Sequence, residues 1–349
     1  MEVKIIENKS DWENFVLSQV NTPTPEQNSV RGMALFVQSF HYGKFYESMS
    51  EQSWIFGVYE DNKLIGGSLV ISTHAKRGNF LYLPYGPVGE INKFLDIFVN
   101  YLKTFAQKNK YDFIRISPFL DETEDNKNLF KKLGFRPAPM HVLAETTWLL
   151  ELDKTEDQLL ADMNKNHRNL IHRCEKENVT IEIKNQVVDL ENFNKLHDET
   201  AKRHNFHRFS KKYITNEFSV FSSNNEALVL NAYLPDGRLD SSAIVMFYGN
   251  MAAYRHGASL GLDKRLPSSY LLQWEAIKEA RKRNIKYYNF WGIAPENSPK
   301  NHPFAGITHF KKGFGGYQKD LLHCQDLPIT KKYWVNWLVE SFRKIKRGF

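Results

Sequence analysis

Hydrophobic and polar residues follow one another along the chain in two series that have the same order. In the first, residues 54–73 (WIFGVYEDNKLIGGSLVIST) contain two apolar runs joined at Asp61-Asn62, which predicts two strands and a tight turn. A third strand, a helix with apolar residues at helical spacing and a fourth strand are then predicted at residues 80–88, 91–110 and 111–118. FKKLGF, residues 130–135, closes this first series.

The second series begins with residues 227–248, which predict a strand pair around a turn at Pro235-Asp236-Gly237. A strand, a helix and a further strand are predicted at residues 251–260, 268–284 and 286–293. FKKGFG, residues 310–315, closes it, almost as FKKLGF closes the first. Two series in matching order predict that one fold occurs twice.

The order strand–strand–strand–helix–strand is that of an acetyltransferase-like (GNAT) sheet, and FKKLGF resembles the closing phrase of that superfamily. In this phrase the glycine is expected to permit a tight turn and the phenylalanine to be buried. We therefore predict two tandem GNAT-like domains of the α/β class with mixed sheets. The first comprises residues 1–150 and 318–349, the second residues 151–317; a chain of 349 residues is long enough for both cores.

Residues 155–178 (TEDQLLADMNKNHRNLIHRCEKEN) are predicted to form one helix between the two series. Thr155 and Gln158 have the spacing of a capping box. The apolar side of this helix comprises Leu159, Leu160, Met163, Leu170, Ile171 and Cys174. Lys165, Arg168 and Lys176 lie largely off that side, as they would on an ordinary surface helix.

The two halves of the chain differ in net charge. The net charge is +7, yet residues 1–150 carry 16 Lys and Arg against 17 Asp and Glu, and residues 151–349 carry 31 against 23. The positive excess in the second half suits an anionic partner such as RNA or a phosphorylated substrate. A solvated basic surface without a partner is the alternative interpretation.

Composition indicates a globular protein, with 42 % apolar and 25 % charged residues. The sequence has no apolar stretch of about 18 residues and no charged-then-apolar leader at Met1, so a cytoplasmic protein is expected. Cys174 and Cys324 provide no disulfide framework, and the histidines lack zinc-ligand spacing, so no metal is expected.

Several motifs together resemble the Fem family (FemA, FemB and FemX) of non-ribosomal peptidyltransferases over essentially the whole chain. They are FVQSFHYGKFYE (36–47), YLPYGPV (82–88), KNHRNLIHRCEKENVTI (165–181), AYRHGASLG (253–261), YLLQWEAIKEARKRNIKYYNFWGI (270–293) and FKKGFGG (310–316). The resemblance implies transfer of an amino acid from aminoacyl-tRNA to a stem-peptide amine of UDP-MurNAc-pentapeptide or lipid II. FemA and FemB also carry a long helical arm, for which residues 151–317 have no room, so the FemX type is more similar.

The resemblance also implies a role for the second closing phrase. In FemX-like proteins its Phe-Lys pair, here Phe310-Lys311, lies near the reacting ester. An ammonium there stabilises the oxyanion that forms when an amine attacks the ester. The alternative is that Lys311 and Lys312 are both solvated, as expected for Lys131 and Lys132.

Further site residues follow from the same resemblance. Lys44, Arg208 and Tyr213 match residues that contact the precursor, although the spacing to the tyrosine is one residue longer here. Tyr254 falls where FemX-type members can have tyrosine. His256 is a candidate proton acceptor, with two alternatives: a histidine held by its neighbours, or assistance by a ribose hydroxyl of the tRNA.

Two rival functions have the same fold. A CoA-dependent N-acyltransferase needs an Arg-x-x-Gly-x-Gly/Ala loop at a helix N-terminus, but Ser268 and Tyr270 occupy that loop in the second series, and residues 86–94 lack the arginine in the first. No cofactor is therefore expected, with aminoacyl-tRNA as co-substrate. A non-catalytic protein that binds RNA or the precursor is the second rival.

The last residues, 329–349, have apolar residues on one face of a predicted helix and basic residues near the end. We interpret this segment as packing back on the first domain, as in the family. Transient contact with the inner face of the membrane is the alternative. The protein is expected to be a monomer.

Overall fold

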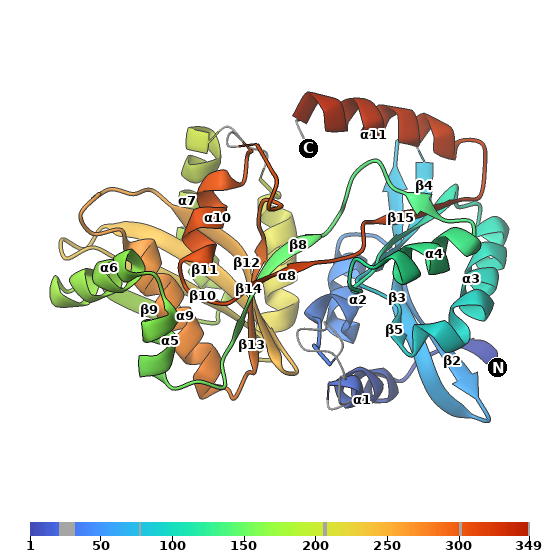
Figure 1. The fold of residues 1–349 in the computed structure, drawn as a ribbon, viewed down its shortest axis with the longest axis horizontal. Helices are drawn as coiled ribbons and strands as arrows, with labels where there is room; N and C mark the ends of the chain where they lie inside the picture. The colour runs from blue at the N-terminus through green and yellow to red at the C-terminus, as the bar shows by residue number, and fades with distance from the viewer. Residues whose placement is uncertain (21–31, 77, 205–207, 300–301, 348–349) are drawn as a thin grey trace. The chain divides into compact units, whose positions relative to one another are not determined.

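The structure is a computed structural model that describes residues 1–20, 32–76, 78–204, 208–299 and 302–347. The chain forms two compact units (Figure 1). The first contains Met1–Thr147, Ala294–His302 and Lys319–Phe349, and the second contains Trp148–Ile293 and Pro303–Gln318. The sequence placed the boundaries at 150/151 and 317/318 and assigned Ala294–His302 to the second domain rather than the first.

An eight-stranded mixed sheet forms the first unit, in the order β1-β2-β3-β4-β6-β15-β7, with β5 paired to β3. Its elements are β1 (Glu2–Ile5), α1 (Lys9–Gln19), η1 (Phe36–Gln38), α2 (Phe40–Ser48), β2 (Ser53–Glu60), β3 (Lys63–Ala75), β4 (Gly78–Pro84), β5 (Val88–Gly89), α3 (Ile91–Lys108), β6 (Phe113–Ser117), α4 (Glu124–Lys132), β7 (Arg136–Pro137), β15 (Gln325–Pro328) and α11 (Tyr333–Arg347). Helix α3 buries Phe94, Phe98 and Leu102 in the core of this unit, as its helical spacing predicts.

The second unit contains a seven-stranded sheet in the order β14-β8-β13-β12-β11-β10-β9. Its elements are β8 (Thr146–Glu151), α5 (Glu156–Asp162), α6 (Lys165–Lys176), β9 (Thr180–Lys184), η2 (Val187–Asp189), α7 (Leu190–His204), α8 (Lys211–Ser222), β10 (Ala227–Tyr233), β11 (Leu239–Tyr248), β12 (Met251–Ser259), α9 (Ser268–Lys282), β13 (Tyr287–Gly292), α10 (Ala305–Lys312) and β14 (Tyr317–Asp320).

The predicted repeat is confirmed by the strand pairing. Strands β2, β3 and β4 are antiparallel, and β4 then pairs in parallel with β6 after helix α3. Strands β10, β11 and β12 repeat this arrangement, and β12 pairs in parallel with β13 after α9. Both predicted turns occur with positive φ, at Asp61 and Asn62 (47° and 61°) and at Gly237 (82°). The mixed α/β fold class is therefore confirmed.

The two copies differ at their parallel strand pair. In the first unit, five residues of β4, Phe80–Pro84, pair with five of β6. In the second unit only Met251–Ala253 of β12 pair with Tyr287–Asn289 of β13, although both strands continue. Tyr254 follows directly after the last paired residue of β12, and Trp291 lies two residues after that of β13. The second unit thus lacks β12–β13 pairing at a place where the first has a complete ladder, although β12 stays paired with β11 there.

The predicted single helix between the series is wrong, because α5 ends at Asp162 and α6 starts at Lys165. The capping box of Thr155 and Gln158 is confirmed. The helix breaks because Met163 is extended (φ −69°, ψ 153°) and buries its side chain in the core. Arg168 donates hydrogen bonds to the carbonyls of Leu160 and Ala161 at 3.2 and 2.9 Å, so it satisfies carbonyls that α5 leaves free at its end.

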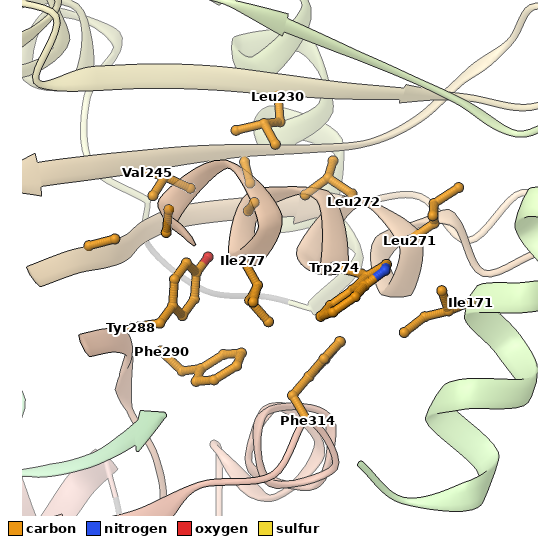
Figure 2. Packing of buried hydrophobic residues seen from close by; sticks show 14 of the residues in the cluster. Ile171, Leu230, Val245, Leu271, Leu272, Trp274, Ile277, Tyr288, Phe290 and Phe314 are labelled. Atoms are coloured by element: carbon orange, nitrogen blue, oxygen red, sulfur yellow. The ribbon is translucent and has the colours of Figure 1, made fainter. Parts of the chain in front are cut away.

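The core of the second unit lies around α9 (Figure 2). Leu271, Leu272, Trp274 and Ile277 of this helix are buried in one cluster with residues of the sheet such as Leu230. Phe314, two residues after the end of α10, is fully buried, and its ring centroid lies 5.5 Å from that of Phe290. The end of α10, which carries Lys311, is thereby fixed against the core.

Within the described parts of the chain, none of the helices has both the length and the apolar character required to cross a membrane.

Candidate active site

Lys311 differs from its counterparts in the first closing phrase by being buried. Its exposed fraction is 6 %, whereas Lys131 and Lys132 are exposed and Lys312 is half-buried. The Lys311 Nζ donates a hydrogen bond of 2.6 Å to the carbonyl of Gly292 and lies 5.9 Å from the centroid of the Tyr254 ring. The interpretation of Lys311 as a solvated lysine is therefore wrong.

Burial lowers the pKa of the Lys311 ammonium from 10.5 to about 7. The direction follows from the loss of water around the charged form, which a single neutral carbonyl replaces only in part. A lysine of this kind changes its charge near neutral pH. Strongly shifted groups of this type are concentrated at functional sites.

The glycines of the two closing phrases have different roles. In the first phrase Gly134 has a φ of +89° and forms the expected turn after α4. In the second phrase Gly313 has a helical φ of −68°, and the left-handed turn falls at Gly315 instead. Gly313 is required for packing, since a Cβ there would lie 1.9 Å from the ring of His167. The expectation of a turn at this second glycine was wrong.

His167 supports the helix that carries Lys311. Its Nε2 lies 2.9 Å from the Phe310 carbonyl oxygen, and its ring packs edge-on against Phe314 with centroids 4.9 Å apart. Burial lowers the pKa of His167, so the ring is neutral near pH 7. The sequence predicted the basic helix that contains His167. It did not predict that the His167 ring packs against Gly313.

We predict that Gly313→Ala destabilises the protein by roughly 1–3 kcal/mol, because the methyl group collides with the His167 ring. Gly306→Ala is the matched control, since Gly306 lies in the same helix and its added Cβ meets nothing within 4 Å. That control should gain up to about 1 kcal/mol. Urea unfolding of both variants tests this, and equal stabilities would contradict the packing role of Gly313.

Trp291 holds the backbone that receives Lys311. It has a φ of +67°, unusual for a bulky residue, and its N–H donates to Asn289 Oδ1 at 2.7 Å. The next residue is Gly292, whose carbonyl accepts from Lys311. Unusual backbone angles of this type occur preferentially at functional sites. This conformation was not foreseen from the sequence.

A buried polar network lies beside these strand ends. Glu217 is fully buried and accepts hydrogen bonds from Arg255 Nε at 3.0 Å and from His256 Nε2 at 2.8 Å. Arg255 also donates to the Tyr213 hydroxyl at 3.1 Å, and its guanidinium lies 5.3 Å from the Trp291 ring centroid. Tyr213 and His256, which the sequence named, are thus joined through Glu217 and Arg255, which it did not.

A β-bulge makes this network possible. Ile244 pairs with His256 and Val245 with Tyr254, so Arg255 is an extra residue in β12. Burial alone would raise the pKa of Glu217, but the charge of Arg255 outweighs it and the pKa is lowered. Burial lowers the pKa of His256, against the opposing effect of Glu217. The network therefore keeps an ionised glutamate beside a neutral histidine.

The remaining two predicted residues have different surroundings. Arg208 is largely buried and donates to the backbone and side chain of Asn194, to Asp198 at 2.7 Å and to the Phe209 carbonyl. Lys44 belongs to the first unit, where it is exposed on α2 with its Nζ 2.7 Å from Glu47. The second unit thus contains Arg208, Tyr213, Tyr254, His256, Phe310 and Lys311.

Comparisons with known proteins agree with this fold. The sequence model of the FemAB family matches residues 27–239 and 236–341. A lipid II:glycine glycyltransferase of Staphylococcus epidermidis is 23 % identical over 308 residues, covering 68 % of this chain and 73 % of that protein. A lipid II:glycine glycyltransferase of Staphylococcus haemolyticus is 33 % identical over 84 residues, covering 24 % of this chain and 20 % of that protein.

Solved structures show the same architecture. The crystal structure of FemX superimposes with a TM-score of 0.82 at 18 % identity, covering 97 % of this chain and 100 % of that one. A tandem GNAT protein from the clavulanic acid biosynthesis pathway matches with a TM-score of 0.56 at 10 % identity, covering 94 % and 99 %. The prediction of two GNAT-like domains is confirmed by these likenesses.

Proposed function

The chain belongs to the FemAB family, and on this premise we propose that it is an aminoacyltransferase acting on a peptidoglycan precursor. The amino acid would come from aminoacyl-tRNA and be attached to a stem-peptide amine of lipid II or UDP-MurNAc-pentapeptide. Relatives named lipid II:glycine glycyltransferase make glycine and lipid II the first pair of substrates to test.

The buried Lys311 is the observation that carries this proposal. When an amine attacks the ester carbonyl of aminoacyl-tRNA, negative charge develops on the carbonyl oxygen. The Gly292 carbonyl holds Lys311 at the end of β13, beyond the residues that pair with β12, and there Lys311 would face that oxygen as an ammonium. A fixed donor in a water-poor site stabilises the transition state more than the substrate.

Lys311 would also accept the proton that the attacking amine has to lose. An amine with a pKa near 10.4 is neutral in only about one in 10³ molecules near pH 7.4. Because the pKa of Lys311 is about 7, about half of the molecules hold it neutral at pH 7. Neutral Lys311 would take this proton and become the cation that faces the oxyanion. It would then return the proton to the ribose oxygen as the ester C–O bond breaks, and the second amine proton would go to water.

Precursor phosphates need cations, for which Lys44 and Arg208 are our candidates. The exposed pair of Lys44 with Glu47 is worth little, so this lysine exchanges partners at small cost. Arg208 would have to give up hydrogen bonds to Asn194 and Asp198, so its recruitment costs more free energy than that of Lys44. Tyr213, Tyr254 and His256 would contact the substrates near Lys311.

A CoA cofactor is disfavoured by carboxylates at both helix starts where its pyrophosphate would bind. Ser268, the first residue of α9, is buried and donates to Asp240 Oδ2 at 2.6 Å. In the first unit α3 has Glu90 as its N-cap residue. A carboxylate near a helix N-terminus repels a phosphate, although the Glu90 side chain makes no capping hydrogen bond to α3 and pairs with Lys93. We therefore propose that the reaction uses no CoA.

The test is transfer of label from a mixture of aminoacyl-tRNAs to lipid II or UDP-MurNAc-pentapeptide by the purified protein. Label should appear in one precursor and be lost when ribonuclease digests the tRNA beforehand. Transfer that instead requires acetyl-CoA would overturn the proposal. Binding of RNA or precursor without any transfer would make the protein the non-catalytic rival.

A further inference from the structure

Helix α11 has two faces of different character. Tyr333 and Asn336 are buried on one face, and Glu340 on the same side is held by Arg115 at 2.7 Å. On the other face five large apolar side chains are exposed, with fractions from 41 % for Trp334 to 78 % for Ile345. These five residues are Trp334, Val335, Leu338, Phe342 and Ile345, called here the apolar stripe. Figure 1 shows α11 at the periphery of the first unit.

Helical geometry places the apolar stripe on one side. At 100° per residue, Trp334, Ile345, Leu338, Phe342 and Val335 fall within about a 100° sector. Asn336, Tyr333 and Glu340 fall in the opposing sector, against the sheet. The stripe is therefore a continuous surface rather than a set of scattered apolar residues, and exposed surfaces of this type mark interaction sites.

Positive charge surrounds the apolar stripe. Lys331, Lys332, Arg343, Lys344 and Lys346 are exposed around it. Glu340 is the one acidic residue of α11, and it faces the guanidinium of Arg115 on the buried side. The accessible surface of this helix thus combines aromatic and aliphatic side chains with cations. This combination is typical of helices that lie in the interface of a membrane.

We propose that the apolar stripe and its surrounding cations dock α11 on an anionic phospholipid surface. The helix would lie parallel to the membrane, with the stripe among the acyl chains and the lysines and arginines at the headgroups. A second copy of the chain fits this face poorly, because a two-fold contact would bring two identical sets of cations together. The inference needs no catalytic activity, so it stands or fails separately from the proposed function.

Sedimentation of the full chain with vesicles tests the proposal. The protein should bind mixed phosphatidylglycerol–phosphatidylcholine vesicles at least about tenfold more tightly than phosphatidylcholine vesicles, because each basic residue near an anionic surface adds attraction. High salt should abolish most of the difference. Equal binding to both vesicle types, or no binding to either, would overturn the proposal.

Two variant pairs separate the apolar from the charged contribution. The double variant Phe342→Ser/Ile345→Ser should weaken binding at least about tenfold, since both side chains would be buried in acyl chains. Val188→Ser, with a side chain 76 % exposed in the second unit, should have no effect. Lys344→Gln/Lys346→Gln should weaken binding to the mixed vesicles, whereas Lys131→Gln/Lys132→Gln, a pair that is also exposed, should not.

Sedimentation of the protein without vesicles measures its oligomeric state and so tests whether the apolar stripe binds a second copy instead. All four variants change exposed side chains, so their melting temperatures should match wild type. If the protein dimerises without vesicles and Phe342→Ser/Ile345→Ser restores the monomer, the stripe is an interface between copies and the membrane proposal is wrong.

Discussion

Lys311→Met is expected to lower the rate of aminoacyl transfer by roughly 10²–10³-fold while it makes the folded protein more stable. The loss of rate follows from removing the donor that faces the oxyanion. The gain in stability follows from the burial of Lys311, because an ammonium taken out of water costs free energy that a methionine does not. Opposite effects on activity and stability are the signature of a residue kept for chemistry.

The expected stability change depends on pH. Lowering the pKa of Lys311 from 10.5 to about 7 corresponds to roughly 5 kcal/mol. Below pH 7 both the folded and the unfolded chain bind this proton, and wild type bears the full cost. Between pH 7 and 10.5 only the unfolded chain binds it, so the stability of wild type rises with pH relative to the variant.

We therefore expect Lys311→Met to exceed wild type by about 3 kcal/mol at pH 6, since it also loses the bond to Gly292. The advantage should shrink to near zero by about pH 10. Denaturant unfolding across this range measures the difference, and single-turnover transfer measures the rate.

Lys312→Met is the matched control for both effects. Lys312 is the next residue, half-buried, with its Nζ 5.1 Å from the Trp148 ring centroid. It should transfer at a rate within about twofold of wild type and should not gain the stability expected of Lys311→Met. If Lys311→Met kept the wild-type rate, the electrophilic role of Lys311 would be wrong.

The repeat could be read from the sequence because it rests on local signals. The periodicity of residues 91–110 and the turns at Asp61-Asn62 and at Gly237 depend on neighbouring residues alone. The prediction of one continuous linker helix was wrong because it also rested on a local pattern. Such a pattern does not show that Met163 is buried in the core or that Arg168 replaces the helical N–H donors at the end of α5.

The burial and the hydrogen bonds of the site residues could not be predicted from the sequence in the same way. Lys131 and Lys311 occur in nearly identical phrases, yet one is exposed and the other buried. Tertiary contacts alone make this difference, because α10 packs its end on His167 and Phe290. Glu217 was missed because its partner His256 lies 39 positions away and no spacing rule joins them. The family resemblance singled out Lys311, whereas the residues alone favoured a solvated lysine.

The largest loss of stability is expected at Asp326, which fixes the C-terminal segment to the first sheet. Asp326 in β15 is fully buried and accepts two hydrogen bonds from Arg115 of β6, at 2.7 and 2.8 Å. Arg115 binds Glu340 of α11 with its other donors, and the Tyr333 hydroxyl lies 3.2 Å from Asp326. Burial alone would lower the pKa of Arg115, but Asp326 outweighs it and raises the pKa, so the guanidinium stays charged.

Asp326→Ala should therefore cost about 3–5 kcal/mol, because it leaves the guanidinium of Arg115 buried without its principal partner. The double variant Arg115→Met/Asp326→Leu removes the fully buried pair and should be more stable than Asp326→Ala, since the only carboxylate that loses its partner is that of Glu340, whose side chain is 15 % exposed. Glu191→Ala, which breaks an exposed pair with Lys195, is the control and should change little. Urea unfolding of the three variants measures these differences in stability. If Asp326→Ala were as stable as Glu191→Ala, Arg115 would have to be solvated rather than buried. Asp326 accepts a hydrogen bond from the Tyr333 hydroxyl of α11 and orients the guanidinium that binds Glu340, so Asp326→Ala should also loosen this helix and increase amide exchange across it. That result would show that the buried Asp326–Arg115 pair holds the apolar stripe in its orientation.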